Sequence, residues 1–354
     1  MNKIINILKK KKSIPLNQFI NIALYDKKFG YYMKKNPFGQ KGDFVTAPLI
    51  SNLFGEMIAI WCIAFWEHLK KPKKILIVEL GPGDGSLCKD LLKTFKKFNN
   101  FYNCLEINLL EISDNLKMIQ KAKINDKRVK WIKKISEIHC GPTIFLGNEF
   151  FDSLPIKQIY KKGNLFFEKY VTLSNDKKKI KFLYKKANKN IIKSIKDLKL
   201  ISFGNIIEYP IKAIEYLETI IKKVDKFGGG LLIFDYGYVQ TKNRDTVQAI
   251  YKHRYSNLLS NPGSSDITSH VNFNLFRKIF KKHNFEVRKI ITQNEFLQKM
   301  GIMERAYILS KKMTFRGKAD MFYRLKKLLD YREMGSLFKV FFTQKRNGKF
   351  SLGF

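Results

Sequence analysis

The residues from Glu79 to Gly85 have the spacing E-x-G-x-G-x-G, with glycines at Gly81, Gly83 and Gly85. Glycine adopts positive φ and leaves room for a ligand to approach the main chain. The spacing differs from the dinucleotide motif G-x-G-x-x-G, because Ser86 stands where the third glycine would be, and the Gly-Lys-Ser/Thr of a P-loop is absent. These residues indicate either a structural turn or contact with a ligand that need not carry phosphate.

The flanking residues place this turn between a strand and a helix. The apolar run 75–80 is typical of a strand buried on both faces. From Ser86 the apolar residues recur at helical spacing. Strand, glycine turn and helix form the first unit of a doubly wound α/β sheet, in which ligands bind beyond the carboxyl ends of the strands.

A second apolar run, 104–113, ends near Glu111, and a helix is expected from Asp114 with Ser113 as its N-cap. The second strand of such a sheet lies beside the first, so the Glu111 carboxylate is expected at the edge of the glycine turn and could accept both ribose hydroxyls of an adenosine. S-adenosylmethionine (SAM) fits, because it has a ribose, an amino-acid tail and no pyrophosphate. The alternative is that Glu111 only caps the strand in water.

Seven strands are expected, with helices between most of them. This order predicts an α/β fold of the class I methyltransferase (Rossmann-like) type, a seven-stranded sheet whose last strand is antiparallel, with an N-terminal extension and inserted substrate-binding segments. The strands are expected near residues 75, 106, 129, 143, 230, 286 and 338.

The expected domain organisation has three parts. Residues 1–74 form an N-terminal helical segment that packs on the cofactor site. Residues 75–237 and 272–354 form the SAM-binding core, with a β-rich insertion near 158–200 that carries hairpin signals at Gly163 and at Asn175. Residues 238–271 are rich in Ser, Asn and Gly and are expected to form a long loop or cap.

At this point the sequence resembles the MidA family, whose mitochondrial members are arginine methyltransferases that assist the assembly of respiratory complex I. The resemblance covers nearly the whole chain from about Ile14. It departs at three positions, where Asp84 replaces arginine, Ala47 replaces serine and Asn272 replaces aspartate. The segments that carry it are LYDKKFGYYMKKNPFGQKGDFVTAPLISNLFGEMIAIW (24–61), ELGPGDGSL, NEFFDSLPIKQ, GGGLLIFDYG, DITSHVNF, TQNEFLQKMGIMERA and MGSLFKVF, in this order.

The resemblance implies a SAM cofactor and a protein arginine acceptor. It places Gly42, Asp43 and Phe44 over the cofactor, and His270 within reach of the acceptor. The cofactor-binding residues expected from the motifs and the resemblance together are Gly42, Asp43, Phe44, Glu79, Gly81, Gly83, Gly85, Glu111 and Asn148.

An arginine acceptor stays protonated in water, and paired carboxylates can hold its guanidinium by bidentate hydrogen bonds. Glu149 and Asp152 follow the fourth expected strand, where class I enzymes place acceptor contacts, so they are the expected catalytic pair, with His270 as a third candidate. The alternative is that Glu149 caps the loop and Asp152 begins a turn before Pro155.

The formal net charge of +38 would suggest nucleic acid or an anionic membrane as a partner. Only 10 of the 68 basic residues are arginine, the residue that nucleic-acid surfaces favour. Abundant Lys, Asn, Ile, Phe and Tyr are typical of an AT-rich genome, which argues against a nucleic-acid partner. The lysine runs 9–12 and 70–74 remain candidate sites for a negatively charged partner.

Other features set limits on compartment and metal binding. The sequence has no 18-residue apolar run and therefore no expected transmembrane segment. Residues 1–13 lack a signal core and the arginines of a transit peptide, which favours a bacterial cytoplasm over a mitochondrial matrix. The four cysteines lack C-x-x-C spacing and the histidines form no ligand pair, so no metal is expected.

Three functions stay open on the sequence. The first is a protein arginine methyltransferase that acts on a subunit of respiratory complex I or a similar protein. The second is a SAM-dependent methyltransferase for another acceptor, and the third is a SAM-binding assembly factor without catalysis. The sequence leaves the oligomeric state open, and a dimer is compatible with it.

Overall fold

The computed structural model describes residues 2–34, 37, 46–200, 205–240, 245–345 and 348–354, so the predicted cofactor residues Gly42, Asp43 and Phe44 lie outside the described residues. The chain forms two compact units. The sheet unit comprises Phe38–Phe150, Thr219–Gly237 and Phe280–Phe354, and the second unit comprises Met1–Pro37, Phe151–Glu218 and Tyr238–Ile279.

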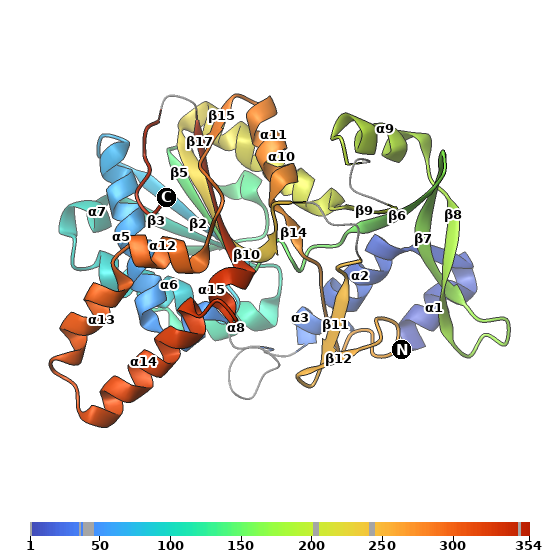
Figure 1. Ribbon diagram of the computed structural model, residues 1–354, viewed down its shortest axis with the longest axis horizontal. Helices are drawn as coiled ribbons and strands as arrows, with labels where there is room; N and C mark the ends of the chain where they lie inside the picture. Colours follow the sequence, from blue (N-terminus) through green and yellow to red (C-terminus); the bar gives the residue numbers. More distant parts are fainter. Residues whose placement is uncertain (1, 35–36, 38–45, 201–204, 241–244, 346–347) are drawn as a thin grey trace. The chain divides into compact units, whose positions relative to one another are not determined.

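The sheet unit contains the seven strands that the sequence predicts, in the spatial order β4-β3-β2-β5-β10-β17-β15 (Figure 1). The first five run parallel, and β17 is antiparallel to both of its neighbours, which confirms the predicted reversal of the last strand. Their bounds are β2 (Ile75–Leu80), β3 (Leu105–Leu110), β4 (Val129–Ile132), β5 (Thr143–Asn148), β10 (Gly229–Tyr238), β15 (Phe285–Val287) and β17 (Phe338–Lys345). The short β16 (Ile291–Thr292) also pairs with β17.

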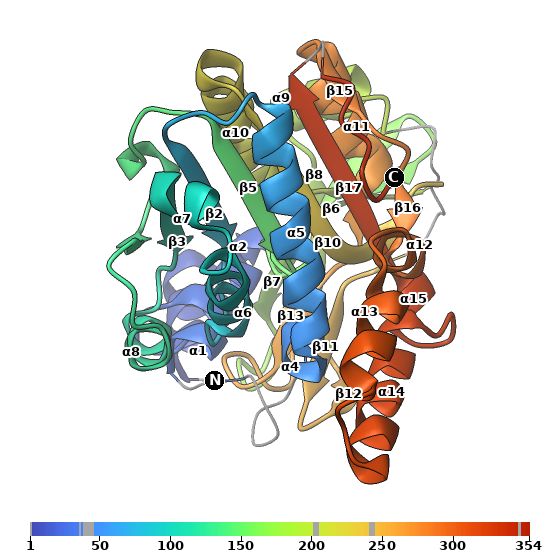
Figure 2. The same ribbon diagram turned by 90° about the vertical axis from the view of Figure 1, so that its left-hand side faces the viewer.

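Helices α5 (Asn52–His68) and α6 (Ser86–Phe95) pack against each other and belong to the same hydrophobic core as the central strands. Figure 2 shows α5 lying across one face of the sheet. Every residue of β2 is buried, as expected for a strand covered on both faces. The other helices of this unit are α4 (Ala47–Ile50), α7 (Asn99–Cys104), α8 (Asp114–Lys123), the 3₁₀ turn η1 (Ile135–Glu137), α12 (Gln293–Lys299), α13 (Ile302–Ser310), α14 (Phe315–Leu329) and α15 (Met334–Leu337).

The second unit is built on a smaller antiparallel sheet of order β1-β7-β6-β9, with β8 paired to β7. The strands are β1 (Ser13–Pro15), β6 (Lys157–Lys162), β7 (Leu165–Leu173), β8 (Ile180–Lys186) and β9 (Ile206–Tyr209). Two residues join β6 to β7, with Gly163 at φ +58°, so the hairpin predicted there is confirmed. Helices α1 (Asn2–Lys11), α2 (Leu16–Tyr25), α3 (Tyr31–Lys34) and α9 (Lys189–Asp197) complete this part.

The long loop expected over residues 238–271 differs from the structure. A three-stranded sheet of order β12-β11-β13 lies there, formed by β11 (Gln248–Tyr251), β12 (Arg254–Ser256) and β13 (Asp266–Thr268). Strands of three or four residues are too short to show an alternating pattern in a polar segment. The remaining elements, α10 (Ile211–Phe227), β14 (Val271–Asn272) and α11 (Phe273–Lys282), include both helices that the sequence predicts in this part of the chain.

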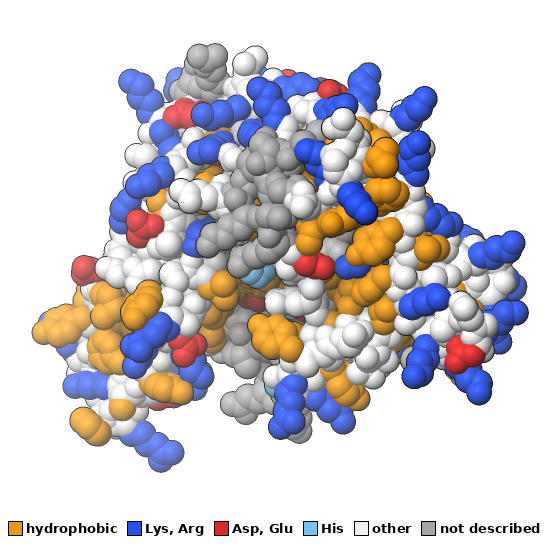
Figure 3. All heavy atoms as spheres, turned by 45° about the vertical axis from the view of Figure 1, so that its right-hand side comes forward, with side chains coloured by type: hydrophobic (Ala, Val, Ile, Leu, Met, Phe, Trp, Pro, Cys, Tyr) orange, Lys and Arg blue, Asp and Glu red, His pale blue; other side chains and the backbone are white. Residues whose placement is uncertain are grey.

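Lysine and arginine side chains are spread over the face drawn in Figure 3, where few acidic side chains appear. This distribution agrees with the even spread of lysine along the sequence. The described part of the chain contains no helix long and apolar enough to cross a membrane.

An aromatic cluster in the sheet unit provides a test of the core. The Phe342 ring is fully buried and packs edge to face against the rings of Trp61 and Phe65. The distances between ring centres are 4.9 Å to Trp61 and 5.3 Å to Phe65. We expect Phe342→Ala to lower the free energy of unfolding by about 3–5 kcal/mol, because a large cavity replaces the ring. Denaturant unfolding measures this. Phe98→Ala, which removes a ring that is 41% exposed, is the control, and an equal loss in both variants would contradict the packing described here.

Candidate active site

The three glycines of the turn all have left-handed backbone conformations. Their φ angles are +62° at Gly81, +56° at Gly83 and +82° at Gly85, a region that other residues enter only with strain. A Cβ atom on Gly81 would lie 2.8 Å from Cδ2 of Phe150. The turn therefore needs glycine both for its conformation and for its close packing.

Glu79, two residues before Gly81, is buried in β2, and its side chain lines a pocket together with the glycine turn. Its residue is 3% exposed, and its Oε2 atom has no hydrogen-bond partner among the described residues. Burial, and then the nearby Asp84 carboxylate, raises the pKa of Glu79 to about 8. A buried acceptor without a partner is costly, so this atom is suited to a ligand that brings a donor or a positive charge.

The glycine turn lines a pocket of about 380 Å³, open mouth included, within the sheet unit. The pocket lies at the carboxyl ends of β2 and β5, where the doubly wound fold places ligands. Its lining residues are Thr46, Pro48, Glu79, Gly81, Pro82, Gly83, Asp84, Leu87, Asn148 and Glu149. Five of the residues predicted to contact the cofactor or the acceptor therefore meet in one pocket: Glu79, Gly81, Gly83, Asn148 and Glu149.

Glu111 follows β3, whose residue Leu110 lies opposite Leu80 in the sheet. The carboxylate accepts hydrogen bonds from the Ser113 backbone N–H (2.7 Å) and from the Gln120 side chain (3.0 Å). Burial raises the pKa of Glu111 to about 7, although these two hydrogen bonds oppose the increase. Glu111 is thus at the predicted edge of the turn, but it is not among the described residues that line the pocket.

Gln120 connects Glu111 to the glycine turn, a link that the sequence analysis missed. Its Nε2 donates to the Gly83 carbonyl oxygen (2.8 Å) as well as to Glu111, and its Oε1 accepts from the Trp131 indole (2.9 Å). Gln120 is fully buried on α8. A polar residue on the buried face of a helix was the available signal. The predicted N-cap is confirmed, because the Ser113 hydroxyl accepts from the Leu116 N–H at 3.3 Å.

Asp84, where the family pattern has arginine, stabilises the start of α6. It accepts from the Ser86 N–H and hydroxyl, both at 3.0 Å, and forms an ion pair with Lys123. Asn272, where the family pattern has aspartate, accepts a hydrogen bond from the Leu275 N–H at 3.0 Å in the first turn of α11. Both departures are therefore used as helix-start residues.

Glu149, the first predicted carboxylate, follows β5 with a left-handed backbone at φ +51°. Its N–H donates to the Phe234 carbonyl oxygen (2.9 Å), and its carboxylate accepts from the Asn148 amide (3.3 Å). Left-handed glutamate is rare and strained, and such strain concentrates at functional sites.

Asp152 and His270 belong to the second unit, so the predicted carboxylate pair is divided between the two units. Asp152 is 4% exposed, and its carbonyl oxygen accepts from the Ser269 N–H at 2.9 Å. His270 lines a separate pocket of about 330 Å³ with Phe151, Glu208 and other residues of the second unit.

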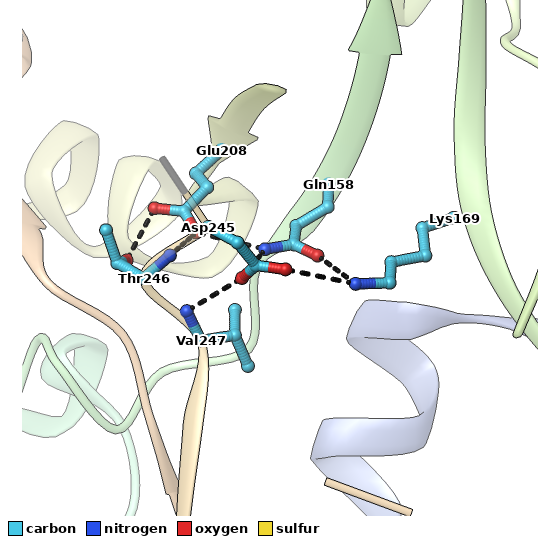
Figure 4. Close-up of polar contacts among 6 residues, drawn as sticks. All are labelled: Gln158, Lys169, Glu208, Asp245, Thr246 and Val247. Atoms are coloured by element: carbon cyan, nitrogen blue, oxygen red, sulfur yellow. Dashed lines mark hydrogen bonds and ion pairs between the residues drawn. The ribbon is translucent and has the colours of Figure 1, made fainter. Parts of the chain in front are cut away.

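A polar network holds the segment before β11 against the small sheet (Figure 4). The Lys169 ammonium, on β7, donates to Gln158 Oε1 (2.8 Å) and pairs with Asp245 (3.2 Å), and Gln158 Nε2 donates to Glu208 Oε1 (3.0 Å). Glu208 accepts from the Thr246 N–H at 2.8 Å and from its hydroxyl at 2.6 Å.

The network reaches His270, because Thr246 Oγ1 accepts from the His270 N–H at 3.0 Å. The other members, Lys169, Glu208, Asp245 and Thr246, lie outside the segments that carry the family resemblance, so only Gln158 and His270 belong to quoted motifs.

The sheet order, the glycine turn and the acidic residue that ends the second strand define a class I SAM-dependent methyltransferase. A family model for S-adenosyl-L-methionine-dependent methyltransferases matches residues 57–291. The chain belongs to this family, the MidA family that its motifs predict.

Relatives named protein arginine methyltransferase NDUFAF7, mitochondrial, match most of the chain. The Xenopus tropicalis protein is 29% identical over 96% of this chain and 84% of its own length. The human protein is 27% identical over 93% and 79%, and the homolog from Caenorhabditis elegans is 30% identical over 78% and 70%.

Solved structures agree with the fold. A crystal structure of a Burkholderia thailandensis protein bound to S-adenosyl-homocysteine has a TM-score of 0.82 at 21% identity and covers 98% of this chain and 92% of its own. A native structure of a protein of the same superfamily and organism has a TM-score of 0.81 at 22% identity and covers 98% and 91%.

SAM is the cofactor of this family, and the pocket fits it. SAM carries a sulfonium and an ammonium group, and the buried Glu79 Oε2 and Asn148 Oδ1 are acceptors without partners among the described residues. Glu79 and Asn148 would face the positively charged part, and Glu111 the ribose. No cluster of three or more His, Cys, Asp or Glu that could hold a metal occurs in the described ranges.

We expect Glu111→Ala to weaken S-adenosyl-homocysteine binding by about 10- to 100-fold, through the loss of two charge-assisted hydrogen bonds to the ribose. Titration calorimetry measures the affinity. Asp114→Ala, which removes a carboxylate whose side chain is 81% exposed, is the matched control. Unchanged affinity in a folded Glu111→Ala protein would remove Glu111 from the site.

The raised pKa of Glu79 predicts pH-dependent cofactor binding. Below about pH 8 this carboxyl is protonated in the free protein, whereas the ammonium group of a bound ligand such as S-adenosyl-homocysteine favours its charged form. Binding should therefore release a proton, and the affinity for S-adenosyl-homocysteine should rise from about pH 6 to pH 8, by at most about tenfold per pH unit. Calorimetry in buffers of different ionisation enthalpy measures the proton count. Glu79→Gln should bind more weakly and release no proton, and an unchanged proton release in this variant would assign it to another group.

Proposed function

We propose that this methyltransferase acts on an arginine side chain of a protein. The main observation in support is that Glu149 lines the same pocket as the glycine turn and Glu79. An acidic group would therefore lie beside the expected methyl donor. The names of the relatives that match 96% and 93% of the chain support the same acceptor.

Methyl transfer asks mainly for positioning. The cofactor, when bound, supplies an electrophilic methyl group on sulfur. The residues of the site would have to hold an acceptor nitrogen facing that methyl group, with the sulfur as leaving group, and accept the proton that the nitrogen gives up. Holding the nitrogen in line with the bond accounts for much of the acceleration in reactions of this kind.

Carboxylates suit a guanidinium acceptor, because two parallel N–H···O bonds fix the plane of the group. Glu149 would receive these bonds in the pocket, and its strained backbone fixes the direction of its side chain. Asp152, only three residues further along the chain, is the second proposed contact, and His270 the third. The proposed proton acceptor is a carboxylate of this pair.

The proposed substrate is a subunit of respiratory complex I or a similar protein, and the proposed compartment is the cytoplasm of a bacterium. Incubation of the purified chain with radiolabelled SAM and a lysate of the source organism, followed by mass spectrometry of the labelled band, identifies the acceptor. Methylarginine in a protein supports the proposal. Label on another residue or molecule would identify a different acceptor. Binding of SAM without any transfer would favour the third function, a SAM-binding assembly factor without catalysis.

The variants Glu149→Gln and Asp152→Asn separate binding from chemistry. Each keeps the shape of the side chain but loses the charge that orients a guanidinium. We expect nearly unchanged affinity for S-adenosyl-homocysteine and a decrease in methyl transfer of at least about 10- to 100-fold, for one lost charge-assisted contact in the transition state. Single-turnover transfer is the measurement, with Asp114→Asn as the control. Normal transfer by both variants would leave the arginine assignment without its mechanism.

A further inference from the structure

Helices α13 and α14 form a hairpin in the sheet unit that has apolar side chains on two opposite sides. One side is buried, with Ile302 and Ala306 on α13 and Met321, Leu325 and Leu328 on α14, all members of the unit's hydrophobic core. A helix that packs on a core normally has polar residues on its opposite face. This hairpin does not follow that rule.

The outer side carries six large apolar residues, here called the hairpin patch: Met303, Tyr307, Ile308, Phe315, Phe322 and Tyr323. Phe315 is 88% exposed, Tyr307 is 62% exposed and Tyr323 is 60% exposed. On α14 the positions 315, 319, 322 and 323 share one face, which is the spacing of a second apolar stripe. Figure 3 shows hydrophobic side chains gathered over this hairpin, with lysine and arginine among them, at its lower left.

Residues 302–329 contain eight basic residues and only two acidic ones. Lys326 lies on the apolar stripe itself, one turn after Phe322. Arg316 and Lys318 flank Phe315 at the start of α14. The patch is therefore an apolar surface bordered and interrupted by positive charge.

This charge distribution selects among the partners that could cover the patch. A second copy of the chain would bring two strongly basic surfaces together, which is unfavourable. A protein partner would have to bury Lys326, although lysine is depleted from the core of protein interfaces. At a bilayer surface, by contrast, lysine lays its stem along apolar surface and keeps its charge at the headgroups.

We propose that the hairpin patch binds the surface of an anionic lipid bilayer. Amphipathic helices with aromatic residues on one face and Lys or Arg at its border lie in the headgroup region of such membranes. Tyrosine is favoured at that depth because it has an apolar ring and a polar tip. At 15 residues α14 is too short to cross a bilayer, so the contact lies on the surface. This inference does not depend on the identity of the methyl acceptor.

Vesicle flotation with the full chain tests the proposal. We expect binding to vesicles of phosphatidylcholine with about 30% phosphatidylglycerol at about 0.1 M salt, and much weaker binding to pure phosphatidylcholine. Phe315→Ser with Phe322→Ser should lower the affinity by about tenfold for each ring that is partly buried. Lys318→Gln with Lys326→Gln should lower it by about fivefold for each charge, equivalent to ~1 kcal/mol each.

Matched variants control for the high charge of the whole chain. Lys178→Gln with Lys179→Gln removes two exposed lysines from the turn between β7 and β8, and Tyr255→Ser removes a ring that is 79% exposed. Both should leave vesicle binding within about twofold of the original protein, because neither lies on the hairpin. Unchanged thermal unfolding and S-adenosyl-homocysteine affinity verify that every variant is folded.

Four results would overturn the proposal. The first is a chain that stays unbound with anionic vesicles at low salt. The second is full binding by the Phe315→Ser, Phe322→Ser variant, which would mean that a chain of net charge +38 adsorbs without inserting the patch. The third is a loss of vesicle binding in the Lys178→Gln, Lys179→Gln control that equals the loss in the Lys318→Gln, Lys326→Gln variant. Self-association that disappears in the double phenylalanine variant would assign the patch to a second copy instead.

Discussion

The site depends on a backbone constraint: the chain must leave β2 and enter α6 within five residues, and it does so through three left-handed glycines. This turn fixes where the strand stops and where the helix begins. The Gly81 N–H donates to the Leu110 carbonyl oxygen (3.2 Å), and the Gly83 carbonyl oxygen accepts from Gln120, so the turn also holds the end of β3 and helix α8. The carboxyl ends of the parallel strands are aligned through these contacts.

Burial of carboxyl groups in a strongly basic chain is the second theme. The pKa values of Glu79 and Glu111 are raised to about 8 and about 7, because burial disfavours the charged carboxylates. The hydrogen bonds to Glu111 lower its pKa by less than burial raises it. A carboxyl whose pKa rises on folding stabilises the fold fully below its unfolded pKa, and this stabilisation is lost as the pH rises through the folded pKa. The free protein therefore loses stability from these two groups between about pH 4.5 and 8, the range in which a cationic ligand would restore it. The two buried carboxylates therefore lower the stability of the free protein as they ionise, and the same negative charge favours binding of a positively charged group.

The sequence predicted those features that rest on local patterns. Each main strand is a short apolar run, and the glycine spacing, the Ser113 cap and the hairpin at Gly163 are also local signals. The short strands β11 to β13 lack a period long enough to detect. Gln120 and the network from Lys169 to Thr246 escaped prediction because each depends on a partner tens of residues away, and only the folded chain brings these residues together. The partners are Gly83 for Gln120, Asp245 for Lys169 and Glu208 for Thr246. The roles of the predicted site residues stay predictions.

The position of β17 has a consequence for how the protein is made. This strand is synthesised after every other strand of the main sheet, yet it lies between β10 and β15. During translation β15 therefore has no place in the sheet, and β10 keeps an open edge until residues 338–345 have emerged. An open edge of this kind is a template for wrong pairing with other chains. The nascent chain therefore exposes this edge until late in synthesis, and the strand that completes the sheet is also the one that covers it.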